Sequence, residues 1–104
     1  MNEKQIKKIR SGVKKYLTIT QVYWNTDVAK NPEFQKMFNG FYKIQRRNQN
    51  WYAQYYQMLE ELKRENKCFG DLLREFYNKC VKVEKSFISK MYAIRNPEYP
   101  IIDK

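Results

Sequence analysis

The chain has 104 residues, of which 42% are hydrophobic, so its length supports one domain with a single core and argues against two. With 21 Lys and Arg against 11 Asp and Glu, the formal charge of +10 favours a polyanionic partner, nucleic acid first, although basic residues also serve solubility alone. The absence of histidine excludes Ser-His and Cys-His nucleophile pairs and zinc sites of the usual mixed type.

The first predicted element is an amphipathic helix over residues 2–17. Its apolar residues recur three or four positions apart, at Ile6, Ile9, Val13 and Leu17. This spacing marks one helical face, which we expect to pack in the core. The other face carries the cations Lys4, Lys7, Lys8, Arg10, Lys14 and Lys15. Those predicted to bind nucleic acid are Lys7, Lys8, Lys14 and Lys15.

Further helices are predicted along the rest of the chain. The second begins at Pro32, because Asn31 is a good N-cap and proline suits the first turn, and it extends to about Ile44. The others are expected at about residues 51–66, 70–80 and 84–93. No stretch alternates apolar with polar residues for long enough to form a strand. The sequence therefore predicts an all-α fold, a compact bundle of about five helices in a single helical domain over residues 1–104.

Aromatic residues mark the predicted core of the third helix. Trp51 and Tyr55 share a stripe with apolar residues at helical spacing, so we expect both in the core. Tyr52 and Tyr56 lie off this stripe, and either a core or a surface position remains open for them. In the fourth helix the residues expected to face inward are Leu72, Leu73, Phe76, Tyr77 and Cys80.

A basic and aromatic segment joins the second and third helices. Residues 41–52 contain Arg46 and Arg47, which suit phosphate contacts, together with amides that can hydrogen-bond base edges. Their aromatic rings can stack on unpaired bases. We therefore predict that Arg46 and Arg47 bind nucleic acid, with a solvated connector between helices as the alternative.

The C-terminal residues 81–104 combine a short apolar helical run, an Asn96-Pro97 turn and a run that ends in Pro100-Ile101-Ile102-Asp103. These features resemble the helix-hairpin-helix superfamily of base-excision DNA glycosylases. Residues 83–90 and the two later motifs are more similar still to a poorly described bacterial group that is itself only distantly glycosylase-like.

The resemblance implies a phosphate-binding hairpin at residues 81–83, a following helix at residues 86–93 and a catalytic carboxylate at Asp103. It also implies a Schiff-base lysine at Lys85, eighteen positions before Asp103. Lys82, Lys85 and Lys90 would approach DNA, with a role in solubilising a short helix as the alternative. The hairpin has no glycine, so a turn with positive φ and a close approach to phosphate are costly. In the family a helix follows the carboxylate, whereas one residue follows Asp103 here, so we expect a catalytically inert module.

The sequence leaves several functions open. The first is a basic, nucleic-acid-binding helical protein, with DNA favoured, that is glycosylase-like in its C-terminal part but inert. The second is a protein–protein interaction module or inhibitor from a mobile element, since Tyr, Trp and Arg are frequent in interface hot spots. The third is a DNA glycosylase fragment that uses Asp103. We expect no metal, no cofactor, reduced thiols at Cys68 and Cys80, no membrane partner and a cytoplasmic location.

Overall fold

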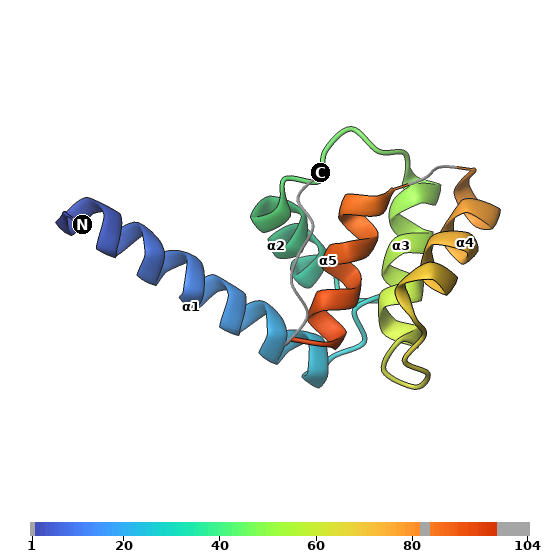
Figure 1. Ribbon diagram of the computed structural model, residues 1–104, viewed down its shortest axis with the longest axis horizontal. Coiled ribbons are helices and arrows are strands. Elements are labelled where there is room, and N and C mark those ends of the chain that lie inside the picture. Colours follow the sequence, from blue (N-terminus) through green and yellow to red (C-terminus); the bar gives the residue numbers. More distant parts are fainter. Residues whose placement is uncertain (1, 82–83, 98–104) are drawn as a thin grey trace. The chain divides into compact units, whose positions relative to one another are not determined.

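The computed structural model describes residues 2–81 and 84–97, and the regular structure in these ranges is entirely helical (Figure 1). The helices in this part of the chain are α1 (Glu3–Asn25), α2 (Pro32–Tyr42), α3 (Gln49–Glu61), α4 (Phe69–Cys80) and α5 (Lys85–Arg95). The prediction of an all-α fold with about five helices is confirmed.

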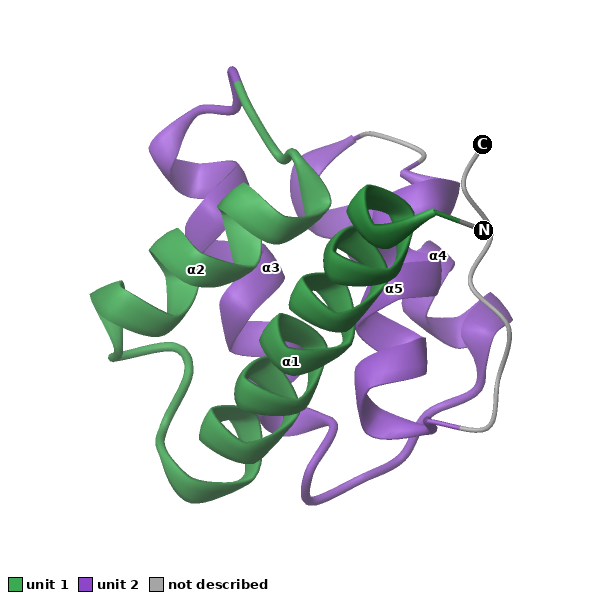
Figure 2. Cartoon of the chain, turned by 90° about the vertical axis from the view of Figure 1, so that its left-hand side faces the viewer, with its two compact units in different colours: residues 1–45 green, residues 46–104 purple. Residues whose placement is uncertain are grey.

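The chain divides into two compact units, residues 1–45 and residues 46–104 (Figure 2). In the first unit α1 packs against α2. In the second unit α4 packs against both α3 and α5. That residues 1–104 form a single domain stays a prediction.

A capping box begins α1. The Asn2 side chain accepts a hydrogen bond from the Gln5 backbone N–H at 2.9 Å, and the Gln5 side chain accepts one from the Asn2 N–H at 3.0 Å. The helix continues well past the predicted end at Leu17. Its buried residues, Ile19 and Tyr23, both lie in this extension, so α1 enters the core through its C-terminal half.

The start of α2 is the predicted one. The Asn31 side chain accepts a hydrogen bond from the Phe34 N–H at 3.1 Å and so satisfies one free donor of the first turn. Lys43 has a φ of 56°, in the left-handed region, and ends the helix just before the predicted end at Ile44. Phe34 and Phe38 are buried with their ring centroids 5.6 Å apart, and they anchor α2 in its unit.

An aromatic cluster forms the core of the second unit. The rings of Trp51 and Tyr55 stack with centroids 4.9 Å apart, and Phe76 of α4 meets Trp51 edge-on at 5.4 Å. All three side chains are buried, which confirms the core prediction for Trp51 and Tyr55. Tyr56 is also buried, whereas Tyr52 is half-buried.

The end of α3 differs from the prediction. The helix ends at Glu61 instead of near Asn66. The reason is a tighter turn, in which the N–H groups of Lys63 and Arg64 bond to carbonyls three residues back instead of four.

The inward face of α4 is narrower than predicted. Leu72 and Phe76 are buried, while Leu73 and Cys80 are only half-buried. Tyr77 is 47% exposed, so the prediction that it faces inward is wrong. Leu73 and Tyr77 are four residues apart and form a neighbouring stripe, at the edge of the face that α4 buries.

Replacing Tyr55 with phenylalanine is expected to lower the free energy of unfolding by about 1–2 kcal/mol. The buried Tyr55 hydroxyl donates a hydrogen bond to the Phe87 carbonyl oxygen at 2.6 Å, and the substitution removes this bond while it retains the ring. Urea denaturation followed by circular dichroism measures the change. Tyr77→Phe is the matched control because Tyr77 is exposed. Equal stabilities of the two variants would contradict a role for this hydrogen bond.

Candidate nucleic-acid interface

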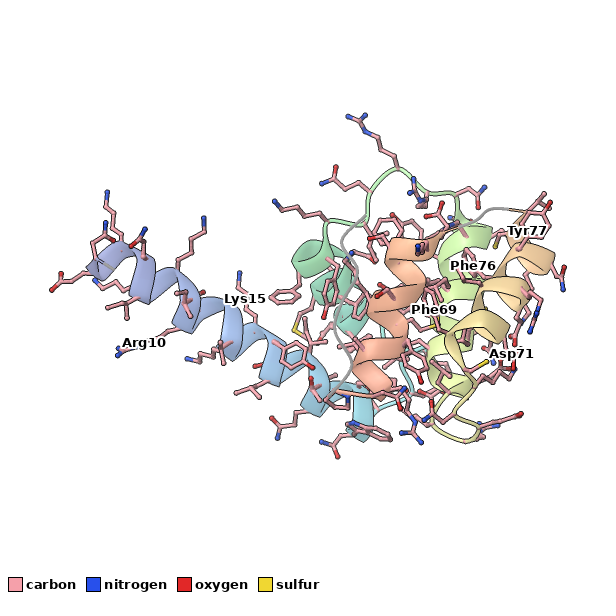
Figure 3. The ribbon with its side chains drawn as sticks, viewed as in Figure 1. Arg10, Lys15, Phe69, Asp71, Phe76 and Tyr77 are labelled. Carbon is pink, nitrogen blue, oxygen red and sulfur yellow. The ribbon has the colours of Figure 1, made fainter. Side chains whose placement is uncertain are left out.

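The predicted cations of the first helix lie together on one half of the surface of α1. We call them the basic face: Lys4, Lys7, Lys8, Arg10, Lys14 and Lys15. All are exposed, and Glu3 is the one acidic residue in the helix. The side chains of Arg10 and Lys15 leave the helix on opposite sides (Figure 3). At about 3.6 residues per turn, Lys4, Lys7 and Lys14 lie between Arg10 and Lys15, and Lys8 lies just beyond Lys15.

Carboxylates of the described residues do not neutralise this face. The ion pairs found in that part of the chain all join side chains between residues 47 and 84. None of these ion pairs involves a cation of α1.

The apolar side of α1 does not lie in the core, contrary to the sequence prediction. Five large side chains on this side are 36–60% exposed, and we call them the apolar stripe: Ile6, Ile9, Val13, Leu17 and Trp24. Helical spacing places residues on one face, but a neighbour must cover that face to bury them. The N-terminal turns of α1 extend past α2, which leaves most of the stripe uncovered within this unit (Figure 1).

Arg46 and Arg47 lie in different environments. Arg46 is exposed, with a φ of 59° in the left-handed region. Arg47 donates to Glu84 Oε2 at 3.2 Å, and its guanidinium carbon lies 5.5 Å from the Trp51 ring centroid and 5.3 Å from that of Phe87. Arg47 therefore connects the start of α3 to the start of α5 through charge and ring contacts. Nucleic-acid binding by either arginine stays a prediction.

The residues implied by the glycosylase resemblance are placed only in part. Lys85 is exposed at the first position of α5, whereas Lys90 is buried and donates a hydrogen bond to Ser86 Oγ at 2.7 Å. Lys82 and Asp103 lie outside the described residues. Val81 ends α4 with a φ of 53°, so a β-branched residue holds a left-handed conformation that glycine adopts at less cost. Catalytic roles for Lys85 and Asp103 stay predictions.

Two lysines of the second unit, Lys67 before α4 and Lys79 within it, pair with Glu75 of the same unit. Burial favours a raised pKa for Glu75, but hydrogen bonds from Lys67 and Lys79 outweigh it and hold the pKa of this carboxyl below its ordinary value. The same bond to Glu75 raises the pKa of Lys67. These lysines are therefore poorer candidates for binding phosphate than those of the basic face.

A groove that sequence reasoning missed lies between α1 and α2 in the first unit. Its volume is about 570 Å³, and the described residues that line it are Lys15, Glu33, Lys36, Met37, Gly40 and Phe41. Five of these belong to one stripe of α2 at spacings of three and four. The spacing of these five residues can be recognised in the sequence, but the position of their stripe beside Lys15 of α1 cannot.

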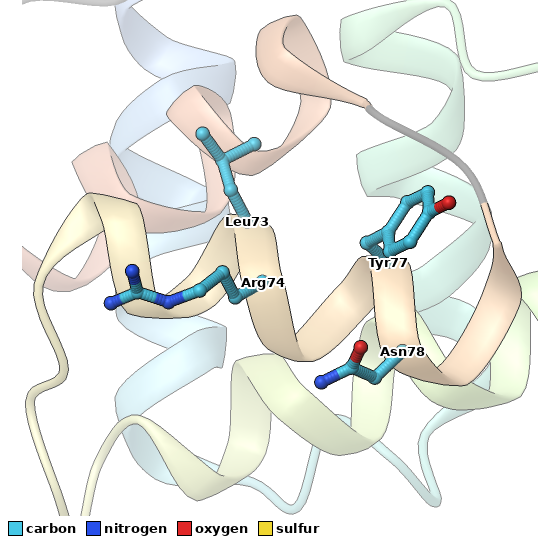
Figure 4. A pocket seen from close by; sticks show the side chains of 4 residues that line it. All are labelled: Leu73, Arg74, Tyr77 and Asn78. Atoms are coloured by element: carbon cyan, nitrogen blue, oxygen red, sulfur yellow. The ribbon is translucent and has the colours of Figure 1, made fainter.

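A second hollow lies on the surface of α4 (Figure 4). It measures about 350 Å³, and its described lining residues are Leu73, Arg74, Tyr77 and Asn78. Arg74 pairs with Asp71, and this hydrogen bond lowers the pKa of the Asp71 carboxyl. Because one helix supplies all four of these side chains and the cation is paired, the hollow offers less for an anionic ligand than the groove of the first unit.

Comparison of the chain with protein-family models, curated proteins and solved structures finds no match. Among the described residues, no helix is long and apolar enough to cross a membrane, and no cluster of three or more Cys, Asp and Glu could hold a metal ion. The candidate interface therefore rests on the charge and geometry of α1, and the helix-hairpin-helix resemblance stays a prediction.

Proposed function

We propose that the protein binds nucleic acid through the basic face of α1. The observation that carries this proposal is a run of six exposed cations with one carboxylate in the same helix. Lys4 to Lys15 spans about 17 Å at about 1.5 Å per residue. This length matches about five base pairs of duplex, so several phosphates lie within reach of one helix. DNA is the favoured partner.

Binding through this face is expected to weaken steeply as salt rises. Each lysine that neutralises a phosphate releases a counterion, so four or five such contacts give a log–log slope of about −4 for duplex DNA. Fluorescence anisotropy with a labelled duplex from about 50 to about 200 mM salt measures this slope. A flat salt dependence would contradict the proposal, as would no binding at the lowest salt.

The C-terminal part is proposed to be glycosylase-like but without lyase activity. A lysine that forms a Schiff base must be deprotonated, and desolvation favours that state. Lys85 is exposed instead, and it follows Glu84, a carboxylate already engaged by Arg47. Base release from damaged duplex that disappears in Asp103→Asn would identify an active enzyme instead.

A protein partner is the second candidate, because the apolar stripe of α1 is exposed. Contiguous exposed apolar side chains often mark interaction surfaces. Apolar contacts gain little from low salt, so a stoichiometric complex that persists at high salt would favour this function over nucleic-acid binding.

A further inference from the structure

The groove between α1 and α2 combines an apolar floor with a charged rim. Met37, Gly40 and Phe41 supply the floor from one stripe of α2. Lys15 of α1 and Lys36 of α2 stand at the rim. The contact surface thus suits a ligand with both a flat apolar part and an anionic part.

Gly40 lines the groove, and the backbone does not require glycine at this position. Its φ is not positive, so the helical conformation does not require glycine at this position. Apart from its chain neighbours and the nearby backbone of α2, a Cβ placed there meets no atom within 4 Å, so a larger side chain would enter open space. Glycine inside a helix costs about 1 kcal/mol relative to alanine. Glycine at position 40 therefore leaves space in the groove that a larger side chain would fill.

The charges at the rim favour an anion. Lys15 and Lys36 face one carboxylate, Glu33, and none of the ion pairs found in the described part of the chain involves either lysine. Lys15 also belongs to the basic face, so a phosphate backbone on that face would lead to the groove. A wholly apolar ligand would make no ionic contact with the two lysines, and a phosphate ion alone would make no contact with the apolar floor.

We propose that this groove accepts the base of an unpaired nucleotide while Lys15 and Lys36 bind its phosphates. The Phe41 ring offers a stacking surface, as aromatic side chains do in proteins that bind single strands. Glu33 can accept a hydrogen bond from a base amino group, and cytosine presents such a group. The inference rests on the proposed nucleic-acid binding and adds a preference for single strands.

The test compares two probes with equal numbers of phosphates: a labelled oligodeoxycytidylate and a strand of the same length without bases. The wild-type protein is expected to bind the first about five-fold or more tightly, the least that one stacked base contributes. Gly40→Leu fills the groove and is expected to abolish this preference. Gly70→Leu is the matched control, because a Cβ at Gly70 also meets nothing within 4 Å and the position lies in α4.

The outcomes separate this inference from the function on which it rests. If wild-type protein binds both probes equally at low salt, or if Gly40→Leu retains the base preference, the groove is not the base site although nucleic-acid binding stands. If neither probe nor duplex binds, both proposals fail. Phe41→Leu keeps an apolar side chain but removes the ring, and it is expected to lose the same preference. Leucine is a better helix former than glycine, and circular dichroism verifies that Gly40→Leu is folded.

Discussion

Replacing Phe76 with alanine is expected to lower the free energy of unfolding by about 3–5 kcal/mol. Its side chain is 0% exposed and lies edge-on to Trp51 at 5.4 Å and to Tyr55 at 6.1 Å. The substitution leaves a cavity between α3 and α4 and removes two aromatic contacts. For a small protein of ordinary stability this loss approaches the whole free energy of unfolding. Urea denaturation followed by circular dichroism measures it.

Tyr77→Ala is the matched control for this prediction. Tyr77 is the next residue of α4, also aromatic, but 47% exposed. We expect its replacement to cost about 1 kcal/mol or less, since much of its surface already contacts water. Similar losses for Phe76→Ala and Tyr77→Ala would show that the face of α4 that is buried differs from the one described.

Local patterns in the sequence predict the five helices that the structure describes and the start of α2, although α1 and α3 end at other residues than expected. The Asn31-Pro32 start of α2 is confirmed because capping depends on residues next to each other in the chain. The predicted burial of Trp51 and Tyr55 is confirmed, and Phe76 of α4 covers the stripe on which they lie.

What depends on tertiary neighbours could not be predicted in this way. The apolar stripe of α1 has the same periodicity as a core face, but α2 is too short to cover the N-terminal turns. Arg47 has the residue type of an exposed side chain, but it pairs with Glu84. Glu84 comes 37 positions later, and no local pattern joins the two residues. The groove likewise needs Lys15 of one helix beside Gly40 of another.

The candidate site also has a part that local spacing predicts and a part that depends on contacts between distant residues. The lysines of the basic face were predicted as a group because helical spacing alone brings them to one side of α1, and the structure places them there. The glycosylase-like arrangement needs Lys85 and Asp103 to meet in space, and Asp103 lies outside the described residues. The basic face is therefore the part of the candidate site that substitutions at described, exposed residues can test.

Reversing Lys7, Lys8 and Lys14 to glutamate is expected to weaken binding to duplex DNA by about a hundred-fold or more at low salt. The variant loses three phosphate contacts, so its log–log salt slope should be shallower by about three. Lys15 is left unchanged because it also lines the groove, and a change there would confuse the two proposals. Anisotropy titrations at several salt concentrations give both quantities.

The matched control reverses Lys30, Lys43 and Arg64, which are exposed cations outside α1. Each reversal changes the charge by −2, so three of them lower the formal charge of +10 by 6 to +4 in both variants. A partner attracted only by net charge would leave the two variants equally weak. If the partner contacts the basic face, the control variant should bind DNA about as tightly as the wild type, and the α1 variant should bind it far more weakly. Equal weakening would therefore remove α1 from the interface even if the protein binds DNA.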